Sequence, residues 1–293
     1  MGTKYLKEFP YIKEFFLEAN EILNFDILDL CLNGPEDKLD LTINAQPSIL
    51  IISYCAFQIL QRETGIKPFL MAGHSLGEIS ALCCSGAISF PDTLRIVRKR
   101  GELMQQAVKE GIGAMLAISG LSINEVQKLC DDFPGAKAVI SNINSSKQIV
   151  ISGEKECIEI ISRKVRLMGA DAKLLNVSAP FHSPFMKPAA TGLESELNNY
   201  SFSKLNYPVI SNVTCKPYMD ENEIIPLLTE QVIHAVNWVK IMEYINRTRV
   251  NITVEFPPKN TLTRFFQNQK SGIISYTFNQ LEEIEALLKA EVL

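Results

Sequence analysis

The sequence lacks most features of secreted, metal-binding and nucleic-acid-binding proteins. Its seven cysteines are scattered, odd in number and free of any C-x-x-C pair, which argues against a disulfide framework and a zinc site. Lys and Arg number 29 against 33 Asp and Glu, so the net charge of −4 provides no basic surplus for a phosphate backbone. No linker, low-complexity tract or repeat interrupts the chain. We therefore expect a compact cytoplasmic protein that has no nucleic-acid partner.

A signal peptide and a membrane span are also missing from the sequence. The opening residues, MGTKYLKEFPYIKEFF, carry charges every few positions and include no apolar run. The stretch 41–61 is uncharged and long enough to cross a bilayer, but its Thr, Asn, Gln and Ser side chains make it too polar. It predicts a buried core helix that begins near Pro47, and no membrane partner.

The composition is that of a globular protein with a sizeable core. The chain has 293 residues, of which 46% are hydrophobic and 21% charged, so one large domain or two coupled domains are possible. Apolar spacing predicts helices over 9–23, 47–62, 76–84 and 91–108, and a strand over 69–72. Strands that alternate with helices predict an α/β fold with a mainly parallel sheet.

The segment from 111 to 177 has a different rhythm. Its apolar patterns follow the order β-α-β-β-α-β, which is typical of a ferredoxin-like subdomain. We therefore predict three parts: a large subdomain that begins with 1–110, an inserted ferredoxin-like subdomain over 111–178, and the rest of the large subdomain over 179–293.

The most informative motif is Gly73-His74-Ser75-Leu76-Gly77, a G-x-S-x-G sequence between the predicted strand and the next helix. In such an elbow the turn is too tight for side chains at the flanking positions, and the serine oxygen is exposed above the sheet. The following helix directs its N-terminal N–H groups at the serine, so the N–H of Leu76 is a candidate oxyanion donor. This context favours a serine nucleophile over a chance match.

A serine nucleophile needs a general base, and the chain has only three histidines. His74 adjoins the serine on the elbow, where its side chain should point away from the reacting face. His234 is expected in the middle of a helix, where a lone histidine is more often a packed or surface residue. His182, in the loop sequence VSAPFHSPFM, is therefore the predicted base. No acidic residue stands in a motif-like setting to complete a triad.

Arg100 has two possible interpretations. It follows Arg95, Arg98 and Lys99, and such a cluster is usually a solvated basic face. Alternatively its guanidinium could hold a substrate carboxylate with two hydrogen bonds, a geometry that suits arginine better than lysine. From spacing alone, the solvated face is favoured.

Five strings of the sequence together resemble the malonyl-CoA:acyl carrier protein transacylases. They are TINAQPSIL, AGHSLGEISAL, RGELMQQA, SAPFHSPFM and QVIHAVNW, in that family's order, and the resemblance runs from about residue 5 to about residue 265. It implies an α/β-hydrolase-like core with a ferredoxin-like insertion. It also implies transfer of a malonyl group from coenzyme A to the phosphopantetheine thiol of an acyl carrier protein, with no cofactor beyond the thioester substrate and no metal.

The resemblance also implies a role for each matching residue. Ser75 would carry the acyl group, His182 would be base and acid, and Arg100 would bind the malonyl carboxylate. The backbone carbonyl of Gln231 would orient the histidine, which would explain the absent acidic residue. Three further residues are expected at the substrate: Gln46 lining the site, Phe181 excluding an α-methyl group, and Asn142, with its neighbour Asn144, at the subdomain cleft.

Several alternatives remain open at this stage. The enzyme could serve fatty acid synthase, or feed a modular polyketide synthase in trans, which PVISNVTCKPY and RKRGELMQ favour. A hydrolase acting on carrier-protein thioesters is a third possibility, although the retained Arg100 favours transfer. Compared with the family, the chain starts after the usual first strand and G-Q-G-S-Q turn, and Pro257 and Lys259 replace two glycines of a later turn. The truncated start predicts a less stable and poorly active homologue, and we expect a monomer.

Overall fold

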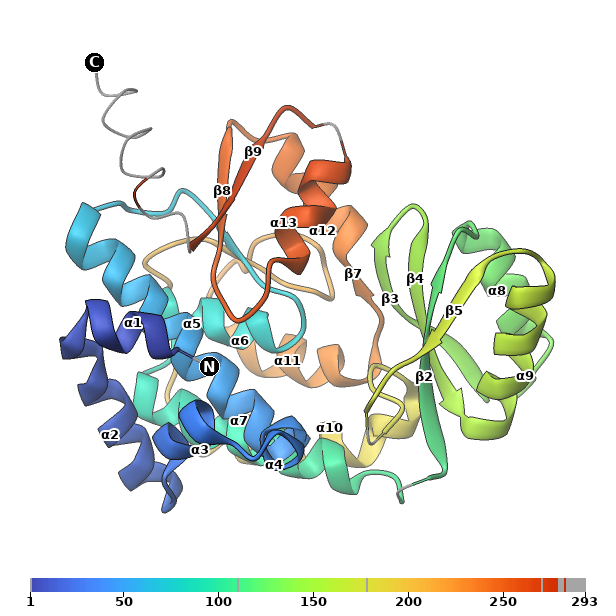
Figure 1. Cartoon of the computed structure of the whole chain (residues 1–293), viewed down its shortest axis with the longest axis horizontal. Coiled ribbons are helices and arrows are strands. Elements are labelled where there is room, and N and C mark those ends of the chain that lie inside the picture. Colours follow the sequence, from blue (N-terminus) through green and yellow to red (C-terminus); the bar gives the residue numbers. More distant parts are fainter. Residues whose placement is uncertain (1, 110, 178, 270, 279–281, 283–293) are drawn as a thin grey trace.

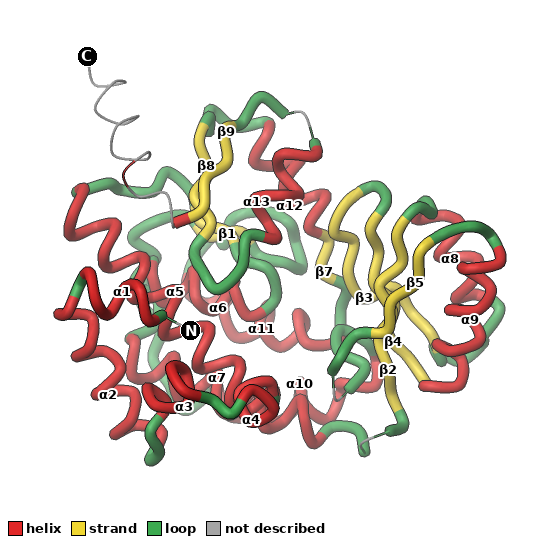
Figure 2. Tube along the Cα trace, in the orientation of Figure 1, coloured by secondary structure: helices red, strands yellow, loops and turns green. Residues whose placement is uncertain are grey.

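The computed structural model has two lobes, a large helical one and a smaller one built on a sheet (Figure 1). It describes residues 2–109, 111–177, 179–269, 271–278 and 282. Figure 2 shows that helices dominate the large lobe and that most strand residues gather in the small lobe. The predicted division at 110/111 and 178/179 stays a prediction, and its positions 1, 110, 178, 270, 279–281 and 283–293 lie outside the described residues.

The large lobe contains helices from both ends of the described chain. Its first helices are α1 (Thr3–Glu8), α2 (Lys13–Leu23), α3 (Ile27–Asn33), α4 (Glu36–Asp40), α5 (Thr42–Thr64), α6 (Leu76–Cys84) and α7 (Phe90–Gln106). Its later helices are α10 (Lys187–Leu197), α11 (Ile224–Ile233), α12 (Trp238–Asn246) and α13 (Thr261–Asn268). Short 3-10 helices cover Pro10–Ile12, Pro184–Met186 and Glu221–Glu223.

The strands of the large lobe are short and pair in parallel, but they do not form one wide sheet. β1 (Met71–Ala72) pairs with β6 (Val209–Ile210), and β8 (Ile252–Glu255) pairs with β9 (Ile274–Thr277). The α/β class is as predicted, whereas the expected mainly parallel sheet is reduced to these two pairs in the described residues. The strand predicted over 69–72 is likewise only two residues long.

The small lobe has the predicted order of elements. β2 (Gly113–Ser119), α8 (Ile123–Asp131), β3 (Ala138–Ser145), β4 (Gln148–Glu154), α9 (Lys155–Leu167) and β5 (Asp171–Leu174) follow one another. Their strands pair antiparallel in the order β5-β2-β4-β3, which is the ferredoxin-like arrangement. A fifth strand from outside this segment, β7 (Val236–Asn237), joins in parallel beside β3. This pairing connects the small lobe to the segment between α11 and α12 of the large lobe.

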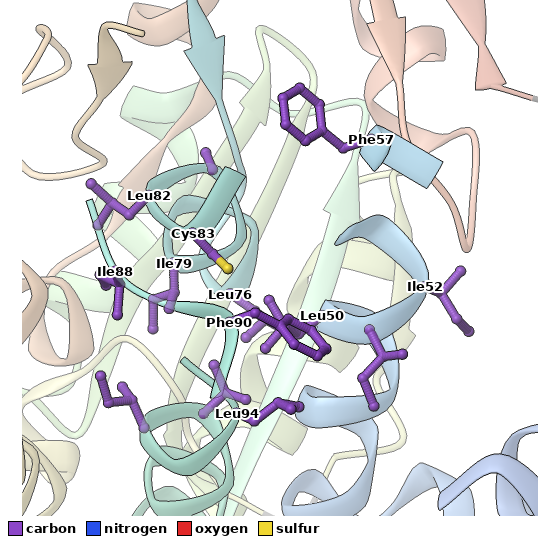
Figure 3. Packing of buried hydrophobic residues seen from close by; sticks show 14 of the residues in the cluster. Leu50, Ile52, Phe57, Leu76, Ile79, Leu82, Cys83, Ile88, Phe90 and Leu94 are labelled. Carbon is purple, nitrogen blue, oxygen red and sulfur yellow. The ribbon is translucent and has the colours of Figure 1, made fainter. Parts of the chain in front are cut away.

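Helices α5, α6 and α7 pack on one another in the core of the large lobe. Figure 3 shows Leu50 of α5, Ile79 of α6 and Leu94 of α7 among the side chains of this cluster, and each is fully buried. By length and composition α5 could cross a membrane, but 61% of its apolar window is buried inside the protein. The long uncharged segment is therefore a core helix, as the sequence predicts.

Helix α5 begins at Thr42, five residues before the predicted start at Pro47. A proline inside a helix has no N–H, so the carbonyl four residues earlier loses its usual donor. Here that carbonyl belongs to Ile43, and it accepts a hydrogen bond of 3.0 Å from the guanidinium of Arg98 on α7. This replacement donor explains why the helix continues through the proline.

Candidate active site

The predicted elbow connects β1 to α6 and holds Ser75 in a strained conformation. Ser75 has φ 54° and ψ −107°, in a region that residues other than glycine rarely adopt. A Cβ at Gly73 would lie 2.0 Å from the backbone of Gly77, so no larger residue fits there. A Cβ at Gly77 would meet no atom within 4 Å. The prediction that the turn leaves no room for a side chain is therefore confirmed at Gly73 and wrong at Gly77.

Ser75 and His182 are hydrogen-bonded, with 2.7 Å between Oγ and Nε2. On the other side of the ring, Nδ1 lies 2.9 Å from the backbone oxygen of Gln231 at the end of α11. A carbonyl oxygen only accepts hydrogen bonds, so Nδ1 must carry the proton and Nε2 is free to accept one from the serine. The arrangement has the geometry of a serine–base pair whose orienting group is a carbonyl in place of a carboxylate.

His182 is strongly biased toward its neutral form. It is buried, and burial lowers its pKa from 6.5 to about 3, assisted by the nearby positive charge of Arg100. The hydrogen bond to the carbonyl of Gln231 opposes this shift without cancelling it. Because only a neutral imidazole can accept a proton, His182 is ready to act as a base well below neutral pH.

Arg100 lies inside the site, so its interpretation as part of a solvated basic face is wrong. Its side chain on α7 is 2% exposed. Nη1 donates to Oε1 of Gln46 at 2.8 Å, and Nη2 donates to Ser75 Oγ at 3.1 Å and to Oε1 of Gln231 at 2.9 Å. Its Nε has no hydrogen-bond partner among the described residues. Burial lowers the pKa of Arg100 to about 10, which leaves the guanidinium charged at neutral pH.

A close approach between α5 and α7 brings Arg100 to Gln46. A Cβ at Gly101 would lie 2.7 Å from the carbonyl oxygen of Thr42 and 2.9 Å from Cα of Ile43. Only glycine allows the two backbones to come this near, and the contact lies next to Arg100 and one turn before Gln46. The local sequence RGE therefore sets the position of the guanidinium.

The N–H of Leu76 is available at the first position of α6. The N–H of Ser75 donates to Oδ1 of Asn212 at 2.7 Å, whereas no acceptor among the described residues takes the N–H of Leu76. A free backbone donor next to the nucleophile at a helix N-terminus suits an oxyanion. This geometry agrees with the predicted oxyanion donor.

Two other predicted residues are not brought to the serine by the described hydrogen bonds. The ring of Phe181 is partly buried against the core of the large lobe. Asn142 lies on β3 opposite Val236 of β7, and its Oδ1 accepts a hydrogen bond from Ser141. Their roles in substrate binding stay predictions.

The remaining histidines lie away from the reacting pair. Nε2 of His74 lies 3.0 Å from Oδ1 of Asn144 in the small lobe, which fits a side chain that points away from the serine. His234 directly follows the last residue of α11, Ile233, and has an extended backbone, so its expected position inside a helix is wrong. Its ring lies 2.9 Å from a carboxylate oxygen of Glu230 at the surface.

Three residues of the site were not found by reading the sequence. Glu78 is fully buried and accepts hydrogen bonds from the backbone of Asn212 at 3.0 Å, from Gln231 Nε2 at 2.6 Å and from the hydroxyl of Tyr218. Asn212 also donates to the carbonyl of Gly73 at 2.8 Å. One signal was available, because Glu78 stands one helical turn after Ser75 in the elbow string. Its partners, by contrast, come from distant parts of the chain.

No group of three or more histidine, cysteine, aspartate or glutamate side chains that could hold a metal occurs within the described ranges. The groups that the structure brings together at the elbow are those of Ser75, His182 and Arg100. A strained serine beside a neutral histidine is suited to covalent acyl chemistry, in which the serine carries the acyl group as an ester between two half-reactions.

Comparisons with known proteins identify the family. The model of the acyl transferase domain family matches residues 1–267, and the chain belongs to this family. A malonyl CoA-acyl carrier protein transacylase of Bacillus subtilis is 38% identical over 98% of this chain and 72% of its own length. One of the same description from Escherichia coli (strain K12) is 36% identical over 96% of this chain and 92% of its own.

Solved structures give the same result. The malonyl CoA-acyl carrier protein transacylase of Coxiella burnetii matches with a TM-score of 0.95 at 34% identity, over 99% of this chain and 92% of that one. A malonyl-transacylase in complex with its type II polyketide synthase acyl-carrier protein matches with a TM-score of 0.91 at 36% identity, over 94% of this chain and 90% of that one. The fold, including the inserted small lobe, is therefore that of this group of acyltransferases.

Proposed function

We propose that the protein is a malonyl-CoA:acyl carrier protein S-malonyltransferase that works through a malonyl ester on Ser75. The observation that carries the proposal is the meeting of Ser75 Oγ with both His182 Nε2, at 2.7 Å, and Arg100 Nη2, at 3.1 Å. The pair of nucleophile and base provides acyl transfer, and the buried cation beside them provides a partner for a carboxylate on the acyl group. The named relatives support malonyl-CoA and an acyl carrier protein as the two substrates.

In the first half-reaction Ser75 Oγ attacks the thioester carbonyl of malonyl-CoA while its proton passes to His182 Nε2. The carbonyl of Gln231 holds the resulting imidazolium through Nδ1–H. The backbone N–H of Leu76 donates a hydrogen bond to the carbonyl oxygen and stabilises the negative charge that develops on it. The carbon–sulfur bond then breaks, and the departing thiolate of coenzyme A takes the proton from His182. No metal or redox cofactor is needed, because the thiolate is a good leaving group.

In the second half-reaction the phosphopantetheine thiol of the carrier protein gives its proton to His182 and attacks the seryl ester. The carbon–oxygen bond breaks, and Ser75 Oγ recovers the proton from His182. Carrier protein and coenzyme A thus present the same chemical group to one site in turn, as a ping-pong scheme requires.

Arg100 selects the acyl group within this proposal. Its Nε and Nη2 share one edge of the guanidinium, and no residue in the described part of the chain accepts a hydrogen bond from Nε. A malonyl carboxylate can take the N–H of Nε and, by displacing one of the two present acceptors of Nη2, an N–H of Nη2 as well, while Gln46 keeps Nη1. A hydrolase acting on neutral acyl groups would have no use for a buried cation at the serine, so the geometry favours transfer of a dicarboxylic acyl group. Phe181 and Asn142 complete the substrate site in the proposal.

The same proposal assigns the activity to fatty acid or polyketide biosynthesis. In this proposal the enzyme is a monomer and works in the cytoplasm. Its test is a transfer assay with malonyl-CoA, methylmalonyl-CoA and acetyl-CoA, in the presence and absence of phosphopantetheinylated carrier protein. We expect malonyl transfer to the carrier protein to exceed hydrolysis and to exceed transfer of the other two groups. Hydrolysis at an equal rate with and without carrier protein would instead indicate the thioester hydrolase.

A further inference from the structure

Glu78 is a buried ionisable group that the proposed reaction does not use. It lies on α6 with no exposed surface, one turn after the nucleophile. Burial raises the pKa of Glu78, and hydrogen bonds from Tyr218, Gln231 and Asn212 oppose this shift by stabilising the charged form. A carboxyl group in the protein interior is costly unless it is paired, so this position calls for a physical reason.

The contacts of Glu78 lead directly to the reacting residues. The side-chain amide of Gln231 stands between two charges: its Oε1 accepts from Arg100 at 2.9 Å, and its Nε2 donates to Glu78 at 2.6 Å. The same Nε2 donates to the backbone oxygen of Ser75 at 2.9 Å. Because an amide has one acceptor end and one donor end, only one of its two orientations satisfies both charged neighbours.

The second path from Glu78 runs through Asn212 to the elbow. The carboxylate accepts the N–H of Asn212, whose side chain bonds the N–H of Ser75 and the carbonyl of Gly73. One carboxylate therefore holds the side-chain amide that contacts Arg100 and the backbone of the residue whose side chain fixes the serine backbone.

Arg100 has no charged partner among the hydrogen bonds that it makes. Its acceptors are Gln46, Gln231 and Ser75, and all three are neutral. The negative charge of Glu78 acts on Arg100 and favours its charged form. In the free site, the charge that balances the guanidinium thus comes from Glu78 across one amide group.

We propose that Glu78 is a positioning residue that acts as the internal counterion of Arg100, through Gln231, and so limits how tightly the site holds a malonyl group. This rests on the proposed function of Arg100 as the carboxylate partner. A guanidinium already balanced by an internal carboxylate attracts an incoming carboxylate less than an unbalanced one does. Moderate affinity suits an enzyme that has to pass the malonyl group on, because tight ground-state binding does not raise turnover.

The test is the variant Glu78→Gln, which removes the charge and keeps the shape. The oxygen of the new amide can accept from Asn212 and Gln231, and its NH₂ can donate to the hydroxyl of Tyr218, which also accepts. Binding of malonyl-CoA and acetyl-CoA is measured by calorimetry in a Ser75→Ala background, where no acyl transfer occurs. We expect malonyl-CoA to bind about tenfold tighter than in the background protein, while acetyl-CoA binding changes less than about twofold.

Glu78→Asp is the matched control, because it disturbs the contacts and keeps the charge. It should lower the melting temperature, yet its ratio of malonyl-CoA to acetyl-CoA affinity should stay within about threefold of the background protein. If Glu78→Gln does not fold, this ratio carries the test, and a larger change in Glu78→Asp contradicts the inference.

The outcomes separate this inference from the proposed function. If the background protein itself binds malonyl-CoA no better than acetyl-CoA, the role of Arg100 fails. If the background protein discriminates and Glu78→Gln leaves the ratio unchanged or lowers it, only the counterion role of Glu78 is overturned.

Discussion

Replacing Arg100 by alanine removes the only cation that the described hydrogen bonds bring to Ser75. In the variant, the carboxylate of malonyl-CoA enters a buried site and loses two charge-assisted hydrogen bonds. Each such bond contributes about 1.5–3 kcal/mol, so a loss of about 4 kcal/mol, or about 10³-fold in kcat/KM, is expected for malonyl transfer. Acetyl-CoA has no carboxylate and loses only the contact of Arg100 with Ser75, which should cost less than about tenfold.

The assay compares kcat/KM for malonyl-CoA and acetyl-CoA, with one carrier protein at a fixed concentration. Arg95→Ala is the control on the same helix. Its guanidinium makes a surface ion pair with Asp92 at 3.1 Å, a kind of contact that contributes about 0–1 kcal/mol to stability. It should leave both rates unchanged. Equal losses for the two acyl-CoAs in Arg100→Ala would refute the assignment of the guanidinium to the malonyl carboxylate.

Three further predictions follow from the site and the surface. The pKa of His182 is lowered to about 3, so kcat/KM should stay level from about pH 7 to about pH 5, and a tenfold fall per unit that begins near pH 6.5 would contradict it. Below pH 6.5 the unfolded chain binds a proton at His182, whereas the folded protein does so only near pH 3. His182 should therefore lower the free energy of unfolding as the pH falls from about 6.5 to about 3. Gly73→Ala should destabilise the fold by about 3 kcal/mol or more, because its Cβ would meet backbone at 2.0 Å, whereas Gly77→Ala should melt close to the parent; equal melting temperatures would show that the elbow tolerates side chains. Charge reversal of three basic residues near the end of α9 should slow transfer to an acidic carrier protein at low salt, and an unchanged rate would remove this group as a docking surface. The residues to be reversed are Arg163, Lys164 and Arg166.

Lys164 already bonds Asp132 at 2.6 Å, and Arg166 donates to the carbonyl of Ala172 at 3.1 Å. Each therefore has a partner within the small lobe, which leaves Arg163 as the member of the group with the greatest freedom to meet a carrier protein. The single variant Arg163→Glu should for this reason account for most of the effect of the triple variant.

Sequence patterns were most informative where the relevant contacts are local. The elbow, the helix that follows it and the β-α-β-β-α-β order depend on neighbouring residues, and the structure has them at the predicted places. The predicted start of α5 was wrong because the helix can continue through Pro47 only with a replacement hydrogen-bond donor. That donor is Arg98, which is 55 residues beyond the carbonyl to which it donates. The strand over 69–72 was predicted two residues too long, because an apolar run does not show which of its residues pair with a neighbouring strand.

The buried side of the site could not be predicted from the sequence for the same reason. Glu78 bonds groups that are 134, 140 and 153 residues away, and no spacing rule connects them. The burial of Arg100 was equally hidden, since a run of four basic residues in six positions looks like a solvated face. What moves Arg100 inside is the close approach at Gly101, which becomes visible only when α5 and α7 are packed together.

The most direct test of the account is mass spectrometry of the intact protein after incubation with malonyl-CoA, followed by mapping of the modified peptide. The account predicts one malonyl group on Ser75, its absence in Ser75→Ala, and its loss from the enzyme when phosphopantetheinylated carrier protein is added, with the group recovered on the carrier thiol. A malonyl group at another residue, or one that persists in Ser75→Ala and still reaches the carrier protein, would contradict it.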